Sequence, residues 1–181
     1  TALRDYVAPP FSLLSSTVEK PTSGDLRANA NIVKRTLESF GIPVEMGEIN
    51  IGPKVTRYTL KPAEGVRLMK IEALNKDLAL ALAAHPIRIE APIPGKSLVG
   101  IEVPNRAAAI VRLGSLVGYP EFSKGGPLTF PIGRDVSGEA IFGDLEKMPH
   151  LLVAGATGSG KSITIHSLLI SLLVKCSPSV L

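Results

Sequence analysis

One segment of this 181-residue sequence constrains its fold more than any other. Residues 155–162 read Gly-Ala-Thr-Gly-Ser-Gly-Lys-Ser and match the Walker A pattern G-x-x-x-x-G-K-S. Glycines at positions 155, 158 and 160 allow the backbone to curl, so that several N–H groups point inward and surround phosphate oxygens. The pattern predicts a loop that binds the phosphates of a nucleoside triphosphate.

Two side chains of this loop have predicted chemical roles. Lys161 supplies positive charge to the β- and γ-phosphates and is the predicted catalytic residue, and the hydroxyl of Ser162 is placed to bind Mg²⁺. ATP and Mg²⁺ are therefore the predicted cofactors. The predicted cofactor-binding residues are Gly155, Ala156, Thr157, Gly158, Ser159, Gly160, Lys161 and Ser162.

The residues on either side of the loop match the strand–loop–helix context that the motif requires. Residues 151–154 form a short apolar run, which is typical of a buried parallel strand. Residues 161–175 contain neither proline nor glycine and are apolar on nearly every side, which predicts a buried helix. A strand and a crossover helix of this kind belong to a multi-stranded parallel sheet.

A second Gly-Lys-Ser occurs at residues 95–97 but lacks this context. The position where a phosphate loop needs its first glycine holds Glu90, and residues 98–103 alternate as a strand does. Pro92 and Pro94 precede the tripeptide. We interpret this segment as a turn between strands.

The part of the chain before the loop predicts a separate α+β domain, with a small sheet covered on one face by helices. Apolar periodicity and turn residues predict its elements. They are a helix from about 25 to 40, strands at 44–51 and 54–61, a helix at 75–84, and strands at 87–91 and 98–103. A glycine-rich stretch at 114–126 is the predicted linker, and 128–132 with 139–142 are a predicted strand pair.

Composition limits the class of protein. The chain is 45% hydrophobic with a single cysteine, Cys176, which predicts a soluble globular protein of a reducing compartment. Its longest apolar stretch is shorter than the roughly 20 residues of a membrane-spanning helix, and its first residues lack the apolar core of a signal peptide. The net charge of +4 lies entirely within residues 1–126 and leaves contact with nucleic acid undecided.

The ends of the sequence predict a piece of a longer protein. The chain begins with Thr1 rather than Met, and residues 176–181 read as a turn followed by the first residues of another strand. We expect the Walker B aspartate, the residue that positions the attacking water and any arginine finger to lie beyond Leu181 or on a neighbouring subunit.

Motifs in both parts of the chain resemble the FtsK/SpoIIIE family of bacterial double-stranded DNA translocases. The form of the Walker A segment with its lead-in is one such motif, and several short motifs of the first part resemble the family's α domain. They are residues 144–145 and 147–162 in the second part, and 52–53, 55–58, 62, 65–66, 77–82, 87–89, 91–97 and 100–105 in the first.

The resemblance implies an ATP-driven motor of chromosome segregation and cell division, assembled as a hexameric ring around double-stranded DNA. It implies an irregular lead-in at 1–19, an α domain at 20–125, and the truncated start of a RecA-like P-loop β domain at 126–181. This piece is expected to be cytoplasmic and without membrane contact, in a parent that can be anchored in the inner membrane. Alone, it is expected to hydrolyse ATP poorly.

Two alternatives stay open from the sequence. The first is another RecA/HerA-type P-loop ATPase, such as a conjugation coupling protein. The second is a non-catalytic assembly or ATP-binding module.

Four other side chains have both a structural and a functional interpretation, and none is predicted to be catalytic. A structural role is favoured for His150, which precedes the predicted strand, and a buried core position for His166. Arg57 and Arg88 are interpreted as solvated charges on strands, with contact to phosphate or to a neighbouring subunit as the alternative.

Overall fold

The computed structural model describes residues 6–177, which form two compact units. One unit comprises Lys20–Ala109 and Asp135–Glu139. The other comprises Thr1–Glu19, Ile110–Arg134 and Ala140–Leu181, of which residues 6–19 and 140–177 are the described parts of its outer segments. We call them the sheet unit and the loop unit. Predictions for residues 1–5 and 178–181 lie outside the described residues.

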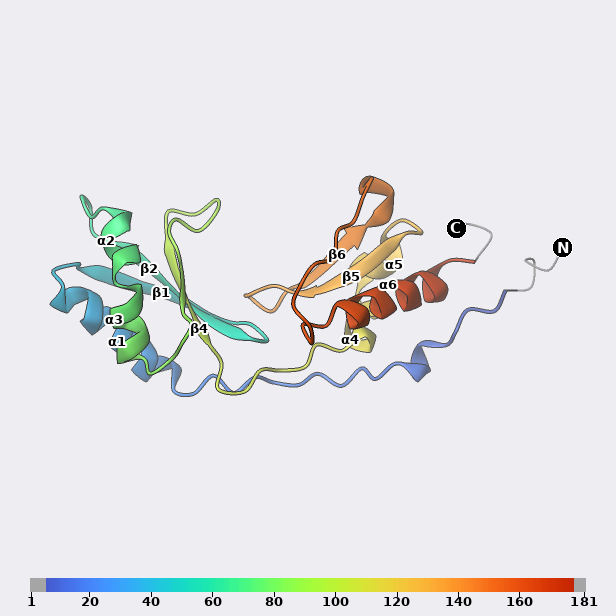
Figure 1. Cartoon of the computed structure of the whole chain (residues 1–181), viewed down its shortest axis with the longest axis horizontal. Coiled ribbons are helices and arrows are strands. Elements are labelled where there is room, and N and C mark those ends of the chain that lie inside the picture. Colours follow the sequence, from blue (N-terminus) through green and yellow to red (C-terminus); the bar gives the residue numbers. More distant parts are fainter. Residues whose placement is uncertain (1–5, 178–181) are drawn as a thin grey trace. The chain divides into compact units, whose positions relative to one another are not determined.

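The sheet unit is an α+β fold built on four antiparallel strands in the order β1-β2-β4-β3 (Figure 1). The strands are β1 Val44–Ile51, β2 Val55–Pro62, β3 Arg88–Glu90 and β4 Val99–Pro104. The helices are α1 Leu26–Ser39, α2 Leu68–Ala73 and α3 Asn75–Ala81. The predicted α+β arrangement is therefore confirmed.

The first helix forms where its periodicity places it. Asp25 caps α1 by accepting a hydrogen bond from the backbone N–H of Ala28 at 3.0 Å, and Gly41 follows the helix with φ +73°. Val33 and Leu37, from the predicted apolar face, are completely buried. Local signals alone therefore position this helix.

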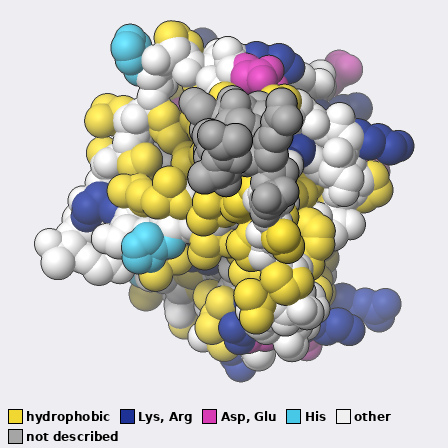
Figure 2. Space-filling model, turned by 90° about the vertical axis from the view of Figure 1, so that its right-hand side faces the viewer, with side chains coloured by type: hydrophobic (Ala, Val, Ile, Leu, Met, Phe, Trp, Pro, Cys, Tyr) yellow, Lys and Arg dark blue, Asp and Glu magenta, His cyan; other side chains and the backbone are white. Residues whose placement is uncertain are grey.

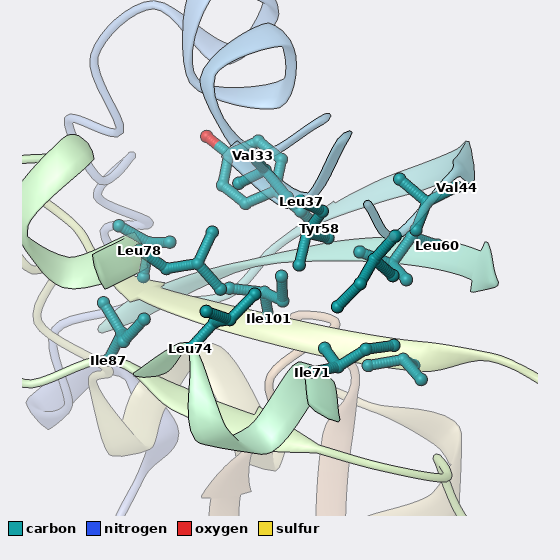
Figure 3. Packing of buried hydrophobic residues seen from close by; sticks show 13 residues of the cluster. Val33, Leu37, Val44, Tyr58, Leu60, Ile71, Leu74, Leu78, Ile87 and Ile101 are labelled. Atoms are coloured by element: carbon teal, nitrogen blue, oxygen red, sulfur yellow. The ribbon is translucent and has the colours of Figure 1, made fainter. Parts of the chain in front are cut away.

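The core lies between these helices and one face of the sheet (Figure 3). Tyr58 and Leu60 of β2 and Ile101 of β4 alternate with polar neighbours, so their side chains share the face that α1, α2 and α3 cover. The fully buried side chains packed there include Val33, Leu37, Tyr58, Leu60, Ile71, Leu78 and Ile101.

Two details of the sheet unit differ from the sequence prediction, and a third agrees with it. The predicted helix at 75–84 ends at Ala81, because Ala83 takes the left-handed conformation at φ +48°. The short α2 was not predicted at all. Residues 95–97 form a turn before β4, with Gly95 at φ +74°, so the rejection of this segment as a phosphate loop is consistent with its structure.

The loop unit holds short elements and one long helix. They are the 3₁₀ helices η1 Phe11–Leu13 and η2 Leu145–Lys147, the helices α4 Leu113–Val117, α5 Pro120–Lys124 and α6 Lys161–Lys175, and the antiparallel strands β5 Thr129–Arg134 and β6 Ala140–Asp144. The predicted strand pair and the predicted helix at 161–175 are present. The stretch at 114–126 is not irregular throughout, since it contains most of α4 and all of α5.

Two burial predictions for the loop unit are wrong. Residues 151–154 form no strand, and Leu152 is 89% exposed, because no described segment pairs with them. Helix α6 buries only Ser171 and Leu172, and leaves Ile163, Ile165 and Leu169 exposed. Figure 2 shows a broad group of hydrophobic side chains on the side of the chain where α6 ends. The apolar pattern of both segments indicated side chains that favour burial. Such side chains become buried only where another segment of the protein packs against them.

No helix within residues 6–177 has the length and apolar character that crossing a membrane requires.

Candidate nucleotide-binding loop

The Walker A segment forms a turn that leads directly into α6. Gly158 has φ +79° and Gly160, the N-cap of the helix, has φ +97°. This left-handed region costs a residue with a Cβ roughly 1–2 kcal/mol, so the backbone itself favours glycine at both positions. Gly155 is needed for a different reason, because a Cβ there would lie 2.4 Å from Oγ of Ser159.

The start of α6 is open to an anion. Gly160 provides no side-chain cap, and the first turn contains no acidic residue. Thr164 belongs to the helix ladder, since its N–H donates to the carbonyl oxygen of Gly160 at 2.9 Å. The first N–H groups of a helix have no partner within it and form the positive end of the helix dipole. These N–H groups and the turn before them together suit a phosphate group.

The ammonium group of Lys161 lies against the backbone of the loop. Its Nζ donates to the carbonyl oxygens of Gly155 at 2.8 Å and Ala156 at 2.7 Å. Both acceptors belong to the loop, so the positive charge of Lys161 lies beside the loop that precedes α6. A bound phosphate offers a full negative charge in place of two carbonyl dipoles, and the ammonium can exchange these bonds for charge-assisted ones.

Ser162 follows Lys161 in the first turn of α6, where it is exposed. Its hydroxyl makes no hydrogen bond with any described residue and is free to bind a cation held by phosphate oxygens. Among residues 6–177, no group of three His, Cys, Asp or Glu side chains could hold a metal ion. A Mg²⁺ ion here would therefore rely on Ser162 and the nucleotide itself.

An apolar hollow of about 440 Å³ lies in the same unit as the loop. Its lining includes Phe130 of β5, Leu151 and Val153 from the segment before the loop, and Ile163 of α6. The segment predicted as a strand thus borders an open apolar space instead of a neighbouring strand.

Two histidines of the loop unit had a predicted structural position. His150 and His166 are both exposed, so the predicted core position of His166 is wrong. His166 lies on a face of α6 that was expected to be buried. This prediction failed for the same reason as the predicted burial of the helix, because no described segment covers this face.

The two arginines of the sheet unit differ from each other. Arg57 is not a solvated charge: its side chain is 15% exposed, and Nη2 donates to Oε2 of Glu90 at 2.8 Å and Oε1 of Glu102 at 2.9 Å. Arg88 is 70% exposed, as interpreted from the sequence, with Nη1 lying 3.7 Å from Oε2 of Glu102. Because Nη2 of Arg57 is paired with two carboxylates, the guanidinium group is not free for phosphate.

One residue that organises the loop unit was missed by sequence reasoning. Nζ of Lys175, the last residue of α6, donates to the carbonyl oxygen of Phe122 and lies 4.7 Å from the centre of its ring. Burial lowers the pKa of Lys175, although the Asp144 carboxylate raises it in part. Lys175 therefore anchors the end of α6 on α5. The partners are 53 positions apart, and no local pattern could have indicated the contact.

Comparison with known families covers both units. The FtsK alpha domain family matches residues 8–105, and the FtsK/SpoIIIE family matches residues 120–181. The chain belongs to the FtsK/SpoIIIE family. The predicted family and two-part fold class, an FtsK alpha domain followed by the start of the FtsK/SpoIIIE domain, are thereby confirmed.

Curated FtsK proteins agree with this membership. The chain is 48% identical over 179 residues to the protein named DNA translocase FtsK of Clostridium acetobutylicum, which covers 96% of this chain and 23% of that protein. It is 47% identical over 178 residues to DNA translocase FtsK of Lactiplantibacillus plantarum, and this match covers 97% of this chain and 22% of that protein. The chain thus spans about a quarter of the length of these relatives.

A solved structure gives a weaker likeness. The pCW3 conjugation coupling protein TcpA, in a monomer form with ATPγS, aligns with 80% of this chain and 42% of its own at a TM-score of 0.36 and 21% identity.

Proposed function

We propose that this chain is the nucleotide-binding start of an ATP-driven translocase of double-stranded DNA. The observation that carries the proposal is the open loop at 155–162 within a chain whose two parts both match FtsK families. Curated relatives that match nearly the whole chain are named DNA translocases.

In this proposal the loop binds ATP with Mg²⁺. The backbone N–H groups at the start of α6 receive the phosphates, and Lys161 leaves the carbonyl oxygens of Gly155 and Ala156 to pair with the β- and γ-phosphates. The hydroxyl of Ser162 becomes a ligand of Mg²⁺. Gly155 and the residues that follow it surround the phosphates.

We also propose a division of labour along the chain. Residues 20–125 serve as the α domain, 126–181 begin the RecA-like β domain, and 1–19 lead into them. The full protein would act as a hexameric ring on double-stranded DNA in chromosome segregation and cell division. This part would lie in the cytoplasm, with any inner-membrane anchor elsewhere in the protein. The piece alone would hydrolyse ATP poorly.

Nucleotide binding by the chain itself tests the first step. A fluorescent ATP analogue with Mg²⁺ should bind the chain and should bind the Lys161→Ala variant at least tenfold more weakly, because a charge-assisted contact to phosphate is lost. Lys124→Ala is the matched control, since it removes an exposed lysine of the same unit outside the loop. Equal binding by all three proteins would contradict the site.

Motor function is tested on the chain extended to its natural C-terminus. The ATPase rate should rise strongly with long double-stranded DNA and should be abolished by Lys161→Ala. ATP hydrolysis that is indifferent to DNA would contradict the translocase and favour a P-loop ATPase with another substrate.

A further inference from the structure

The sheet unit, which does not contain the Walker A loop, has a polar hollow of its own. Its volume is about 360 Å³, and its lining includes Ser23, Asn29, His85, Asn105 and Arg106. No acidic side chain lines it. Four of these residues have a side chain that can offer a neutral donor and one carries a permanent positive charge, so the lining is rich in donors.

Arg106 is held at this hollow without an acidic partner. It follows β4, and its side chain passes over Gly24, where φ is +73° and a Cβ would lie 3.3 Å from Nε of Arg106. Gly24 therefore both allows the turn and leaves room for the guanidinium group. Arg106 forms no ion pair with any described residue.

Asn105 fixes the backbone from which Arg106 projects. Its Oδ1 accepts a hydrogen bond from Oγ1 of Thr56 at 2.7 Å, and its Nδ2 donates to the carbonyl oxygen of Gly52 at 2.9 Å. Its backbone N–H donates to the carbonyl oxygen of Lys54 at 2.9 Å. Asn105 is thus a rigid structural element beside the hollow, and its amide is already used.

A buried hydroxyl group, that of Tyr58, lies next to the lining residue Asn29. The side chain of Tyr58 is fully buried, and its hydroxyl has no hydrogen bond of good geometry to a described residue. Figure 3 shows this hydroxyl pointing away from the other labelled core side chains. Burial raises the pKa of Tyr58, and the neighbouring Asn29 amide opposes part of that rise. Asn29, whose amide lies next to this hydroxyl, is one of the residues that line the hollow.

Groups at or close to the lining residues in the sequence take part in helix ends. The carboxylate of Asp25 accepts a hydrogen bond from the N–H of Ala28 as the cap of α1. At the end of α3, the N–H groups of Ala83 and Ala84 donate to the carbonyl oxygens of Leu80 and Ala79. The N–H groups of Ala83 and Ala84 are therefore not available to a ligand, and the donors that the hollow offers are those of its side chains.

We propose that this hollow binds a phosphate group, with Arg106 as the charged ligand and His85, Ser23 and Asn29 as hydrogen-bond donors. The planar guanidinium group matches two phosphate oxygens at once. The phosphate comes either from a free phosphate compound or from the backbone of DNA, and both sources present the same chemistry to these side chains. The site is distinct from the Walker A loop and acts without it.

The experiment follows inorganic phosphate by NMR on the whole chain carrying Lys161→Ala, so that the Walker A loop is weakened. Ionic strength is held constant with chloride. Saturable shifts are expected for the side-chain amide of Asn29 and the Nε–H of Arg106. The further change Arg106→Gln should weaken phosphate binding by about tenfold or more, since the charge-assisted bonds are lost.

Arg67→Gln is the matched control, because it removes an exposed arginine of the same unit that does not line the hollow. Binding should be unchanged in this variant. Ser23→Ala is the second test, with a smaller loss expected. Absence of saturable shifts, or equal weakening by Arg106→Gln and Arg67→Gln, would overturn the site in favour of general charge attraction.

A short DNA duplex replaces phosphate in a second titration to distinguish the sources. Shifts of the same Asn29 and Arg106 signals, lost with phosphate as competitor, would identify the DNA backbone as the source. Phosphate binding without a response to the duplex would identify a free phosphate compound. Either result supports the phosphate site.

Discussion

Ala83 is the one non-glycine residue with positive φ in the described part of the chain. It ends α3 in a pattern that usually has glycine at this position, with the N–H of Ala84 donating to Ala79 and its own N–H donating to Leu80. The two hydrogen bonds compensate the strained alanine, and the sequence alone gave no sign that the helix would end here.

Replacing Ala83 with glycine should therefore stabilise the sheet unit by about 1 kcal/mol, because the left-handed conformation costs an L-residue roughly that much. Urea unfolding followed by circular dichroism measures the change. Ala73→Gly, in α2 at negative φ, is the contrasting variant and should lower stability by up to about 1 kcal/mol. A loss of stability in both variants would contradict the strain at Ala83.

At Gly160 the chain has glycine where the backbone favours it, in contrast to Ala83. Its φ of +97° is free of strain only for glycine. Gly160→Ala should weaken ATP binding while global stability falls by no more than about 1–2 kcal/mol. A Cβ at Gly160 would meet no atom within 4 Å, so any effect comes from the backbone rather than from a clash.

Gly118 is the matched control for Gly160, because a Cβ there also meets nothing and its φ is −75°. Fluorescence titration with an ATP analogue should find Gly118→Ala unchanged. If both variants bound ATP as the unsubstituted chain does, the conformation of Gly160 would be irrelevant to the loop.

At the level of elements, sequence reasoning succeeded where the signal is local. Helix α1 has its cap, its apolar face and its terminal glycine within a short stretch, and β5 with β6 form around a turn. Sequence prediction failed where the structure depends on a segment distant in the sequence. Residues 151–154 have no described strand to pair with and form none. The pairing of Arg57 with Glu102 depends on the register between β2 and β4. The conformations of Gly158 and Gly160 suit the Walker A motif, while the hydrogen bonds from Lys161 to the carbonyl oxygens of Gly155 and Ala156 were not foreseen.

The segment before the sheet unit is also held by contacts with residues that are distant in the sequence. Glu19 accepts hydrogen bonds from Nη2 of Arg112 at 2.5 Å and from the N–H of Ile110 at 3.3 Å. Ser15 approaches Gly114 so closely that a Cβ on that glycine would lie 2.5 Å from the carbonyl oxygen of Ser15. The predicted irregular lead-in is thus tied to the chain just after the sheet unit.

This attachment should weaken in acid. The hydrogen bond from Arg112, followed by that from Ile110, holds the pKa of Glu19 below its ordinary value of 4.5. A carboxylate with a depressed pKa contributes stability that is complete above about pH 4.5 and is lost as the pH falls through its lower folded value. Limited proteolysis with pepsin from pH 5 downward should therefore find residues 7–19 cleaved more readily as Glu19 protonates.

Glu19→Gln should be cleaved readily at pH 5 already, with a weaker dependence on pH between 5 and the acid limit. Glu121→Gln, an exposed carboxylate of α5 that does not contact this segment, serves as its control. Identical pH profiles for the Glu19 variant and the unsubstituted chain would assign the acid sensitivity to other groups.

At the scale of the whole molecule, apolar burial is divided unequally. The cluster of buried hydrophobic residues lies entirely within residues 33–103 of the sheet unit. In the loop unit the buried hydrophobic side chains are few, and α6 exposes most of its apolar residues. Since burial of apolar area is the main source of stability, the two units should differ in their resistance to unfolding.

We therefore expect the chain to unfold in two steps in urea, with the loop unit first. Hydrogen exchange should find the N–H groups of α6 exchanging at lower urea than those of β2 and β4. ATP with Mg²⁺ should raise the urea concentration at the midpoint of the first transition only. The reason is that a ligand stabilises the state that binds it, by about 2.7 kcal/mol at one hundred times its dissociation constant. Lys161→Ala should remove this shift and leave the second transition unchanged. A single transition that includes both α6 and β4, or an ATP shift of both steps together, would show that the units unfold as one and that the open face of α6 is compensated elsewhere in the chain.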